Sequence, residues 1–137
     1  MSLLFIYNAD ADLFSKVTDF AHKIISPKTY DCALCSLTYG NLGIKNEWAQ
    51  FIKTLPAEIY FLHKDEFLKQ YPQQQLAFPV ILKKEKDTLN IFLSADDINA
   101  CKNLKELELK IETAIEKMKI NLFLTWRFQV PESCSFF

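Results

Sequence analysis

The pattern of apolar and polar positions predicts strands and helices that alternate along the chain. Residues 3–7 form a continuous apolar run, which is typical of a strand buried on both faces. Apolar residues recur at helical spacing over 13–24, and Pro27 ends that predicted helix. A second helical pattern covers 46–55, and 58–62 form the next predicted strand. The first half therefore indicates a strand–helix–helix–strand order.

The second half of the chain predicts a short helix, a hairpin and a long helix. The short helix covers 65–71, with Asp65 as its simplest N-cap. Strands over 78–84 and 88–93 flank a polar turn, which is the pattern of a β-hairpin. Two spacings resemble capping boxes, and the second of them starts a helix over 104–119; the paired residues are Ser94 with Asp97 and Asn103 with Glu106.

The segment 120–130 has apolar residues on alternate positions. This period of two predicts an extra C-terminal strand, and a continuation of the preceding helix is the alternative. We find no internal repeat and no linker, so all 137 residues are expected to form one domain.

The order of the predicted elements over residues 3–118 resembles that of the thioredoxin fold. A βαβ unit is followed by a connecting helix, a hairpin and a closing helix. The resemblance implies an α/β protein with a mixed central sheet of about four to five strands flanked by helices. In thioredoxins a proline begins the first hairpin strand and faces a CxxC pair. Pro79 stands at that place here, although a predicted helix separates the first strand from the CxxC.

Composition and charge exclude several classes of partner. The net charge of −1 gives no basic surface for a nucleic acid. No apolar stretch approaches the roughly 18 residues that span a membrane, and the first residues lack the basic region of a signal peptide. We therefore expect a cytoplasmic protein without nucleic-acid or membrane partners, whose four cysteines are reduced.

Cys32 and Cys35 form a CxxC pair, and both glycines of the chain follow closely behind it. Such a pair is typical of reversible thiol–disulfide chemistry, with Cys32 as the attacking thiol and Cys35 as the resolving one. This redox hypothesis requires an exposed Cys32 whose thiolate is stabilised by a helix N-terminus or a cation, and Asp31 opposes that.

Polar residues follow both predicted parallel strands. Asn8 and Asp10 come after the first strand, and His63 comes after the second. Because functional groups in α/β sheets gather beyond the carboxyl ends of the strands, these residues are expected at one edge, bordered by Pro79. The segment 28–44 is expected to be irregular and to lie across this edge. The predicted catalytic residues are therefore Cys32, Cys35 and His63.

Two alternatives compete with the redox hypothesis. In the first, a non-enzymatic zinc-binding or interaction domain uses Cys32, Cys35, His63 and His22, since two thiolates and two imidazoles satisfy tetrahedral zinc. However, one CxxC is only half of a zinc site. In the second alternative, the two reduced thiols only pack, and His63 is hydrogen-bonded at its strand end.

Short motifs scattered over the first half resemble those of an uncharacterised family of small bacterial proteins, some of them loosely labelled GTPases. They include Tyr7-Asn8-Ala9, Cys32-x-Leu34-Cys35 and Leu62-His63-x-Asp65-Glu66-Phe67. A GTPase is not expected, because the chain has no G-x-x-x-x-G-K-[ST] phosphate loop. The partner is expected to be an unknown protein, or a second copy bound through the C-terminal strand, since an edge strand is a pairing surface.

Overall fold

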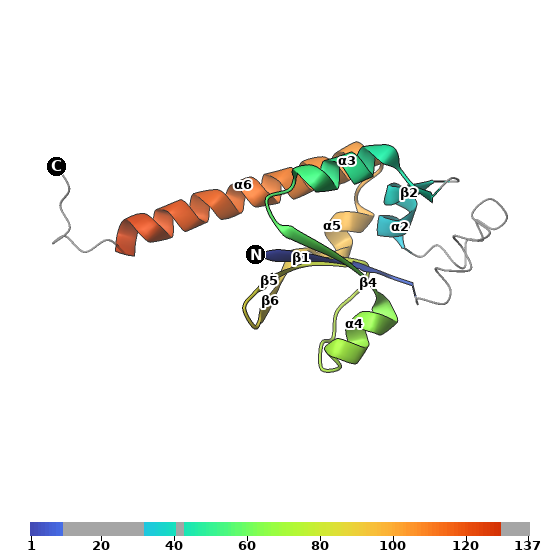
Figure 1. Cartoon of the computed structure of the whole chain (residues 1–137), viewed down its shortest axis with the longest axis horizontal. Coiled ribbons are helices and arrows are strands. Elements are labelled where there is room, and N and C mark those ends of the chain that lie inside the picture. Colours follow the sequence, from blue (N-terminus) through green and yellow to red (C-terminus); the bar gives the residue numbers. More distant parts are fainter. Residues whose placement is uncertain (10–31, 41–42, 130–137) are drawn as a thin grey trace.

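The computed structural model describes residues 1–9, 32–40 and 43–129, in which a four-stranded mixed sheet has helices on both faces (Figure 1). The sheet has the order β4-β1-β5-β6. Its strands are β1 (Ser2–Tyr7), β4 (Glu58–His63), β5 (Val80–Glu85) and β6 (Thr88–Leu93). The helices are α2 (Ala33–Thr38), α3 (Asn46–Thr54), α4 (Lys64–Gln70), α5 (Ala95–Asn99) and α6 (Leu104–Gln129). The expected α/β class is therefore confirmed.

The central strand β1 fixes the arrangement of the sheet. It runs parallel to β4 and antiparallel to β5, which forms an antiparallel hairpin with β6. The predicted strands agree with this sheet to within one or two residues at their ends. The strand predicted from Phe78 begins two residues later, at Val80, and the Phe78–Pro79 peptide bond is cis.

Side chains of β1 pack on both faces of the sheet, as its continuous apolar run predicts. Leu3, Phe5 and Tyr7 point to the face that is covered by α2, α3 and α6. Leu4 and Ile6 point to the other face, where the second core cluster includes residues of α4 and β5. The central strand β1 is thus buried on both faces of the sheet. This burial fixes the positions of the residues at the two ends of β1.

The described part of 28–44 is more regular than expected. The structure has the short helix α2 here, followed by the two-residue strands β2 (Tyr39–Gly40) and β3 (Gly43–Ile44). The Thr38 hydroxyl donates a hydrogen bond to the Leu34 carbonyl oxygen at 2.7 Å, and Gly43 has a φ of 101°, which favours glycine. The prediction of an irregular segment is therefore wrong for 32–40, where the structure has α2 and β2. Side-chain hydrogen bonds and glycine backbone angles of this kind do not appear in the hydropathy pattern.

The predicted strand over 120–130 is wrong as far as the structure describes it, because α6 continues to Gln129. No glycine, proline or turn separates Lys119 from the following residues, so the helix has no reason to end there. Alternation indicates a strand only where one side is buried, yet Ile120 and Leu122 are 57% and 73% exposed. At 26 residues, α6 is about 39 Å long.

The helix caps follow the sequence in part. Ser94 and Asp97 form the expected capping box, with each backbone N–H donating to the other side chain, at 3.1 and 3.2 Å. At α6, the Glu106 N–H donates to Asn103 Oδ1 as expected. The Glu106 carboxylate, however, accepts from the Lys102 N–H and not from the Asn103 N–H that a capping box uses.

The helix predicted over 13–24 lies outside the described residues. Within the described residues, no helix has both the length and the apolar content needed to cross a membrane.

Candidate functional site

A disulfide joins Cys32 and Cys35 at the start of α2. Their Cα atoms are 5.3 Å apart, which is within the range of ordinary disulfides. Cys32 is the N-cap residue of α2, and Cys35 lies in the first turn of the helix. The expectation that this pair is reduced therefore does not match the structure, which has the pair in its oxidised state.

The Cys32 sulfur receives two backbone hydrogen bonds. The Asn8 N–H donates to Cys32 Sγ at 3.3 Å, and the Cys35 N–H donates to the same atom at 3.2 Å. The first bond connects the disulfide to the carboxyl end of β1, across 24 residues of sequence. Both donors point partial positive charge at the sulfur, so they stabilise a thiolate at Cys32 when the disulfide is reduced.

Both sulfur-bearing residues are buried. Cys32 is 1% exposed and Cys35 is 7% exposed, and both belong to the core cluster that includes Tyr7 and Leu34. The redox hypothesis requires an exposed Cys32, and this condition is not met in the structure. The local reason is that α2 packs its first turn against the end of β1 rather than standing clear of the sheet.

His63 lies on the same face of the sheet as the disulfide, one strand away from β1. It ends β4 and is paired with Tyr7 in parallel register, and the two rings are 6.1 Å apart between centroids. Paired residues of parallel strands point to the same face, and Tyr7 packs in the cluster that contains Cys32 and Cys35. The fold thus places His63 beside Tyr7, on the face of the sheet that the cysteines occupy.

Glu66 holds the imidazole ring of His63. Glu66 Oε1 contacts His63 Nδ1 and also accepts the backbone N–H of His63 at 3.1 Å. These hydrogen bonds lower the pKa of the Glu66 carboxyl group. His63, rather than Asp65, is the N-cap residue of α4, so the predicted capping role of Asp65 is wrong. The spacing of three residues between His63 and Glu66 is the sequence signal that identifies this pair.

The predicted neighbourhood of Asn8, His63 and Pro79 is present. The Lys64 N–H donates to the Ala9 carbonyl oxygen at 3.1 Å, which joins the ends of β1 and β4. Ile6 pairs with Val80 in β5, so the preceding Pro79 borders the same edge. Asp10 and His22 lie outside the described residues.

Tyr7 is a polar residue of the site that the sequence does not single out. Its side chain is buried, and its ring meets the ring of Tyr39 edge-on at 6.0 Å between centroids. Burial, followed by the neighbouring Tyr39, raises the pKa of Tyr7 far above its ordinary value. Tyr7 therefore keeps its proton at all physiological pH values, and it adds a neutral phenol to the core cluster that contains the two cysteines.

The described residues contain no group of three or more His, Cys, Asp and Glu side chains placed to hold a metal ion. The predicted zinc ligands Cys32 and Cys35 are joined to each other here. The fourth predicted ligand, His22, lies beyond the part of the chain that can be described.

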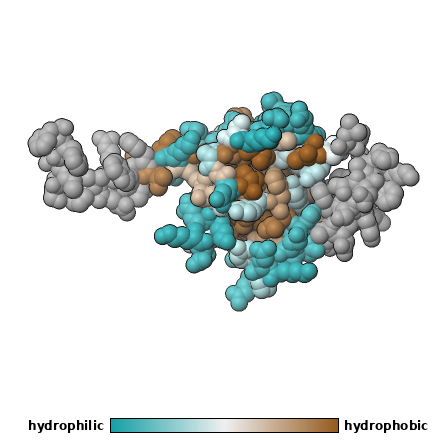
Figure 2. All heavy atoms as spheres, in the orientation of Figure 1, coloured by the Kyte–Doolittle hydropathy of each residue, from teal (hydrophilic) through white to brown (hydrophobic). Residues whose placement is uncertain are grey.

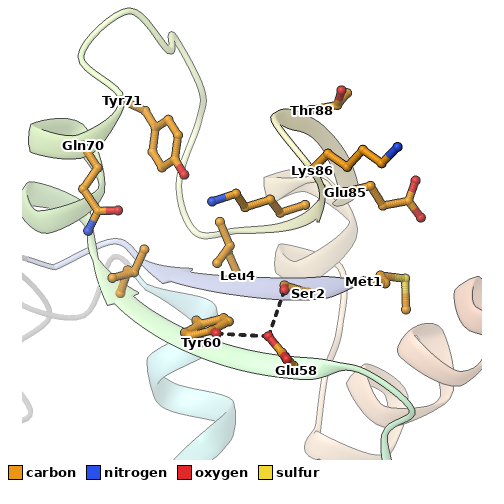
Figure 3. Close-up of a pocket in the computed structure, with 12 residues that line it drawn as sticks. Met1, Ser2, Leu4, Glu58, Tyr60, Gln70, Tyr71, Glu85, Lys86 and Thr88 are labelled. Carbon is orange, nitrogen blue, oxygen red and sulfur yellow. Dashed lines mark hydrogen bonds between the residues drawn. The ribbon is translucent and has the colours of Figure 1, made fainter.

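A separate hollow of about 1120 Å³ lies on the opposite face of the sheet (Figure 3). Its lining includes Ser2 and Leu4 at the amino end of β1, together with Lys84 of β5. Glu58 accepts hydrogen bonds from Ser2 and Tyr60 at its rim. The cysteines and His63 lie at the carboxyl end of β1 on the other face, so the hollow and the disulfide are distinct features.

Comparisons of the chain with protein-family models, with curated proteins and with solved structures found no match.

Proposed function

We propose that the protein is a thiol–disulfide redox protein in which Cys32 and Cys35 alternate between a disulfide and a dithiol. The observation that carries the proposal is the disulfide, whose Cys32 sulfur receives two backbone N–H groups at the end of β1. Donors of this kind stabilise the thiolate that forms on reduction. The site is thus arranged for both oxidation states.

The proposal includes a thioredoxin-like fold. It is supported by the order β4-β1-β5-β6, in which the first two strands along the main sheet are parallel and the last two form an antiparallel hairpin. A further support is Pro79, which comes just before the first hairpin strand and borders the edge with the disulfide. The site differs from the thioredoxin pattern because the cysteines come long after the first strand in sequence.

The proposed reaction transfers two electrons. In the reduced protein, the Cys32 thiolate attacks one sulfur of a disulfide R–S–S–R; a bond forms between Cys32 Sγ and that sulfur, which gives the mixed disulfide Cys32–S–S–R, and RS⁻ leaves. Cys35 then loses its proton and attacks Cys32 Sγ, which closes the Cys32–Cys35 disulfide and releases a second RS⁻. The Cys35 proton and the proton that Cys32 released to solvent when it ionised end on the two R–SH products. Two thiols of the same class reverse these steps and reduce the protein.

We assign His63 to accept the proton that leaves Cys35. It is the imidazole on the disulfide's face of the sheet, and Glu66 acts as the positioning residue for its ring. Glu66→Gln is expected to change the pH profile of disulfide closure, whereas Asp65→Asn, one residue away, is not. If the pH profile of disulfide closure is the same for both variants and for the parent protein, His63 and Glu66 do not take part in the proton transfer.

The burial of the pair limits its access to any substrate. Cys32 is 1% and Cys35 is 7% exposed, so the first turn of α2 must move away from the end of β1 before a substrate disulfide can reach Cys32, and a small substrate needs the smaller opening. We therefore propose a low-molecular-weight disulfide of the glutathione kind as the oxidant, and the corresponding thiol of a reducing cytoplasm as the reductant.

Redox titration tests the proposed function. The Cys101→Ser/Cys134→Ser variant, in which Cys32 and Cys35 are the remaining two of the four cysteines, serves as the background. It is equilibrated in buffers of reduced and oxidised glutathione, and free thiols are trapped and counted by mass. We expect two thiols to appear together, and Cys32→Ser to abolish this transition. A disulfide that stays closed in an excess of reduced glutathione would refute redox cycling.

Native mass spectrometry of protein purified under reducing conditions distinguishes the zinc alternative. The redox proposal expects the mass of the chain without metal. One bound zinc ion that is lost in Cys35→Ala would instead support a metal-binding domain that uses Cys32, Cys35 and His63, with His22 as the fourth ligand.

A further inference from the structure

The second half of α6 extends beyond the body of the protein (Figure 1). Its first half is anchored in the core by buried side chains such as Leu107, Ile111 and Ile115. From Glu116 to Leu124, every side chain that the structure describes is exposed except the half-buried Met118. Figure 2 shows apolar surface on this projecting part of the helix.

Three of the exposed apolar side chains form a row along one side of α6. Leu109, Ile120 and Leu124 are 62%, 57% and 44% exposed. Steps of eleven and four residues are close to three turns and one turn, so the three side chains lie on one side over about 22 Å. Leu109 is two residues from both Leu107 and Ile111, which places the row opposite the core side of the helix.

The charges of α6 are divided between its two halves. Residues 104–116 contain four glutamates and two lysines, and residues 117–129 contain Lys117, Lys119 and Arg127 but no acidic residue. The change of sign falls between Glu116 and Lys117. That point is also midway between Leu109 and Leu124. Two such helices attract each other when they run antiparallel and repel each other when they run parallel.

We propose that α6 pairs antiparallel with α6 of a second copy of the chain, through the row Leu109, Ile120 and Leu124. The twofold axis passes between Glu116 and Lys117. Leu109 of each copy then meets Leu124 of the other, and each acidic half lies along a basic half. A twofold arrangement uses the same surface on both copies, and one row can therefore serve as the whole contact.

Leu109, the member of the row nearest the body, is 62% exposed, although Lys105 on the same side of α6 forms an ion pair with Glu47 of α3 at 2.7 Å. The core contacts the opposite side of the helix, through Leu107, Ile111 and Ile115. The contact also lies away from the disulfide, which is at the far end of the sheet. Dimer formation is thus independent of the proposed redox function, and each can fail without the other.

A pair of substitutions two residues apart tests the contact. Ile120→Glu places a charge in the row, whereas Leu122→Glu places it about 200° around the same exposed helix, at a more exposed position. Native mass spectrometry and light scattering over a range of protein concentrations should show a dimer for the parent chain and for Leu122→Glu. Ile120→Glu should be a monomer at the same concentrations.

Charge variants test the antiparallel arrangement. The first variant carries Lys117→Glu with Lys119→Glu, and the second carries Glu112→Lys with Glu116→Lys. Each alone gives both halves of α6 the same sign, so each should be monomeric. When they are mixed, opposite charges face each other again, and a heterodimer of intermediate mass should form that weakens as salt is added.

Several results would overturn the proposal. The first is a parent chain that stays monomeric at every protein concentration. Binding of α6 to anionic lipid vesicles by such a monomer would show that the exposed row has a different partner. A dimer that Ile120→Glu leaves intact, or that Leu122→Glu disrupts equally, would place the contact elsewhere. Failure of the mixed charge variants to associate would exclude the antiparallel arrangement.

Discussion

Reduction of the Cys32–Cys35 disulfide is expected to leave the protein folded. The disulfide joins residues three apart, so it closes a loop of four residues. The loss of chain entropy for such a loop corresponds to about 2 kcal/mol of stabilisation. Against this, the two N–H groups at Cys32 Sγ bind a thiolate more strongly than a neutral sulfur, and each hydrogen bond to a charged group contributes about 1.5–3 kcal/mol. The net loss on reduction is therefore expected to be about 2 kcal/mol or less.

Urea unfolding of the oxidised and reduced protein in the Cys101→Ser/Cys134→Ser background measures this difference. Both forms should unfold in one transition with similar slopes, and the reduced form should have a slightly lower midpoint. If reduction unfolds the protein, or lowers its stability by more than about 4 kcal/mol, the disulfide is a structural cross-link rather than a redox pair.

Three further predictions concern the fold. Trp48→Ala should destabilise the protein by about 3–5 kcal/mol in urea unfolding, because Trp48 is fully buried and meets Phe5 edge-on; a loss below about 1 kcal/mol would contradict its place in the core. Burial, followed by Glu47, raises the pKa of Glu108, so its contribution to stability falls as pH rises through that pKa. Glu108→Gln should thus be more stable than the parent at neutral pH by about 1 kcal/mol or less, and this gain should vanish in acid; a gain that persists in acid would refute the cause. Leu124→Pro should shorten α6 and lower the helical circular dichroism, while the free energy of unfolding of the monomer, measured at low protein concentration, stays within about 0.5 kcal/mol of the parent; an unchanged helical signal would favour a strand.

Most of the fold follows from patterns that are local in sequence. The run from Leu3 to Tyr7, the polar turn between β5 and β6 and the capping box at Ser94 each specify one element, and each is present. The prediction of a C-terminal strand is wrong because alternation, such as that over 120–130, indicates a strand only where one side of the segment is buried. Whether a segment is buried depends on what covers it, and α6 passes beyond the sheet that would have covered it.

The sequence predicts which residues share the edge of the sheet, but it does not predict the burial and hydrogen bonds of Cys32. The rule for parallel strands places Asn8 and His63 at one edge, and the register of β1 and β4 agrees. The burial of Cys32 and its bond from the Asn8 N–H depend on a contact across 24 residues, which no local pattern encodes. The three-residue spacing between His63 and Glu66 indicates their contact, whereas the simpler interpretation of the same segment gives the capping role to Asp65.

Two opposing effects decide whether reduced Cys32 is a thiolate. Burial removes water from the sulfur, which disfavours negative charge by several kcal/mol. The N–H groups of Asn8 and Cys35 favour that charge by about 1.5–3 kcal/mol each. Because the two effects are of similar size, each donor matters to the balance. A single lost donor should therefore be measurable in the redox equilibrium.

The Asn8 donor can be removed without touching a cysteine. Asn8→Pro deletes the backbone N–H, whereas Asn8→Ala removes only the side chain and keeps the donor. Loss of one bond of about 1.5–3 kcal/mol from the reduced state makes the disulfide harder to reduce by about 30–60 mV. The glutathione titration should show this shift for Asn8→Pro and none for Asn8→Ala, with circular dichroism as the check that both variants fold. Equal midpoints for the two folded variants would mean that the Asn8 N–H does not stabilise the thiolate, and the redox role would then have to depend on the Cys35 N–H alone.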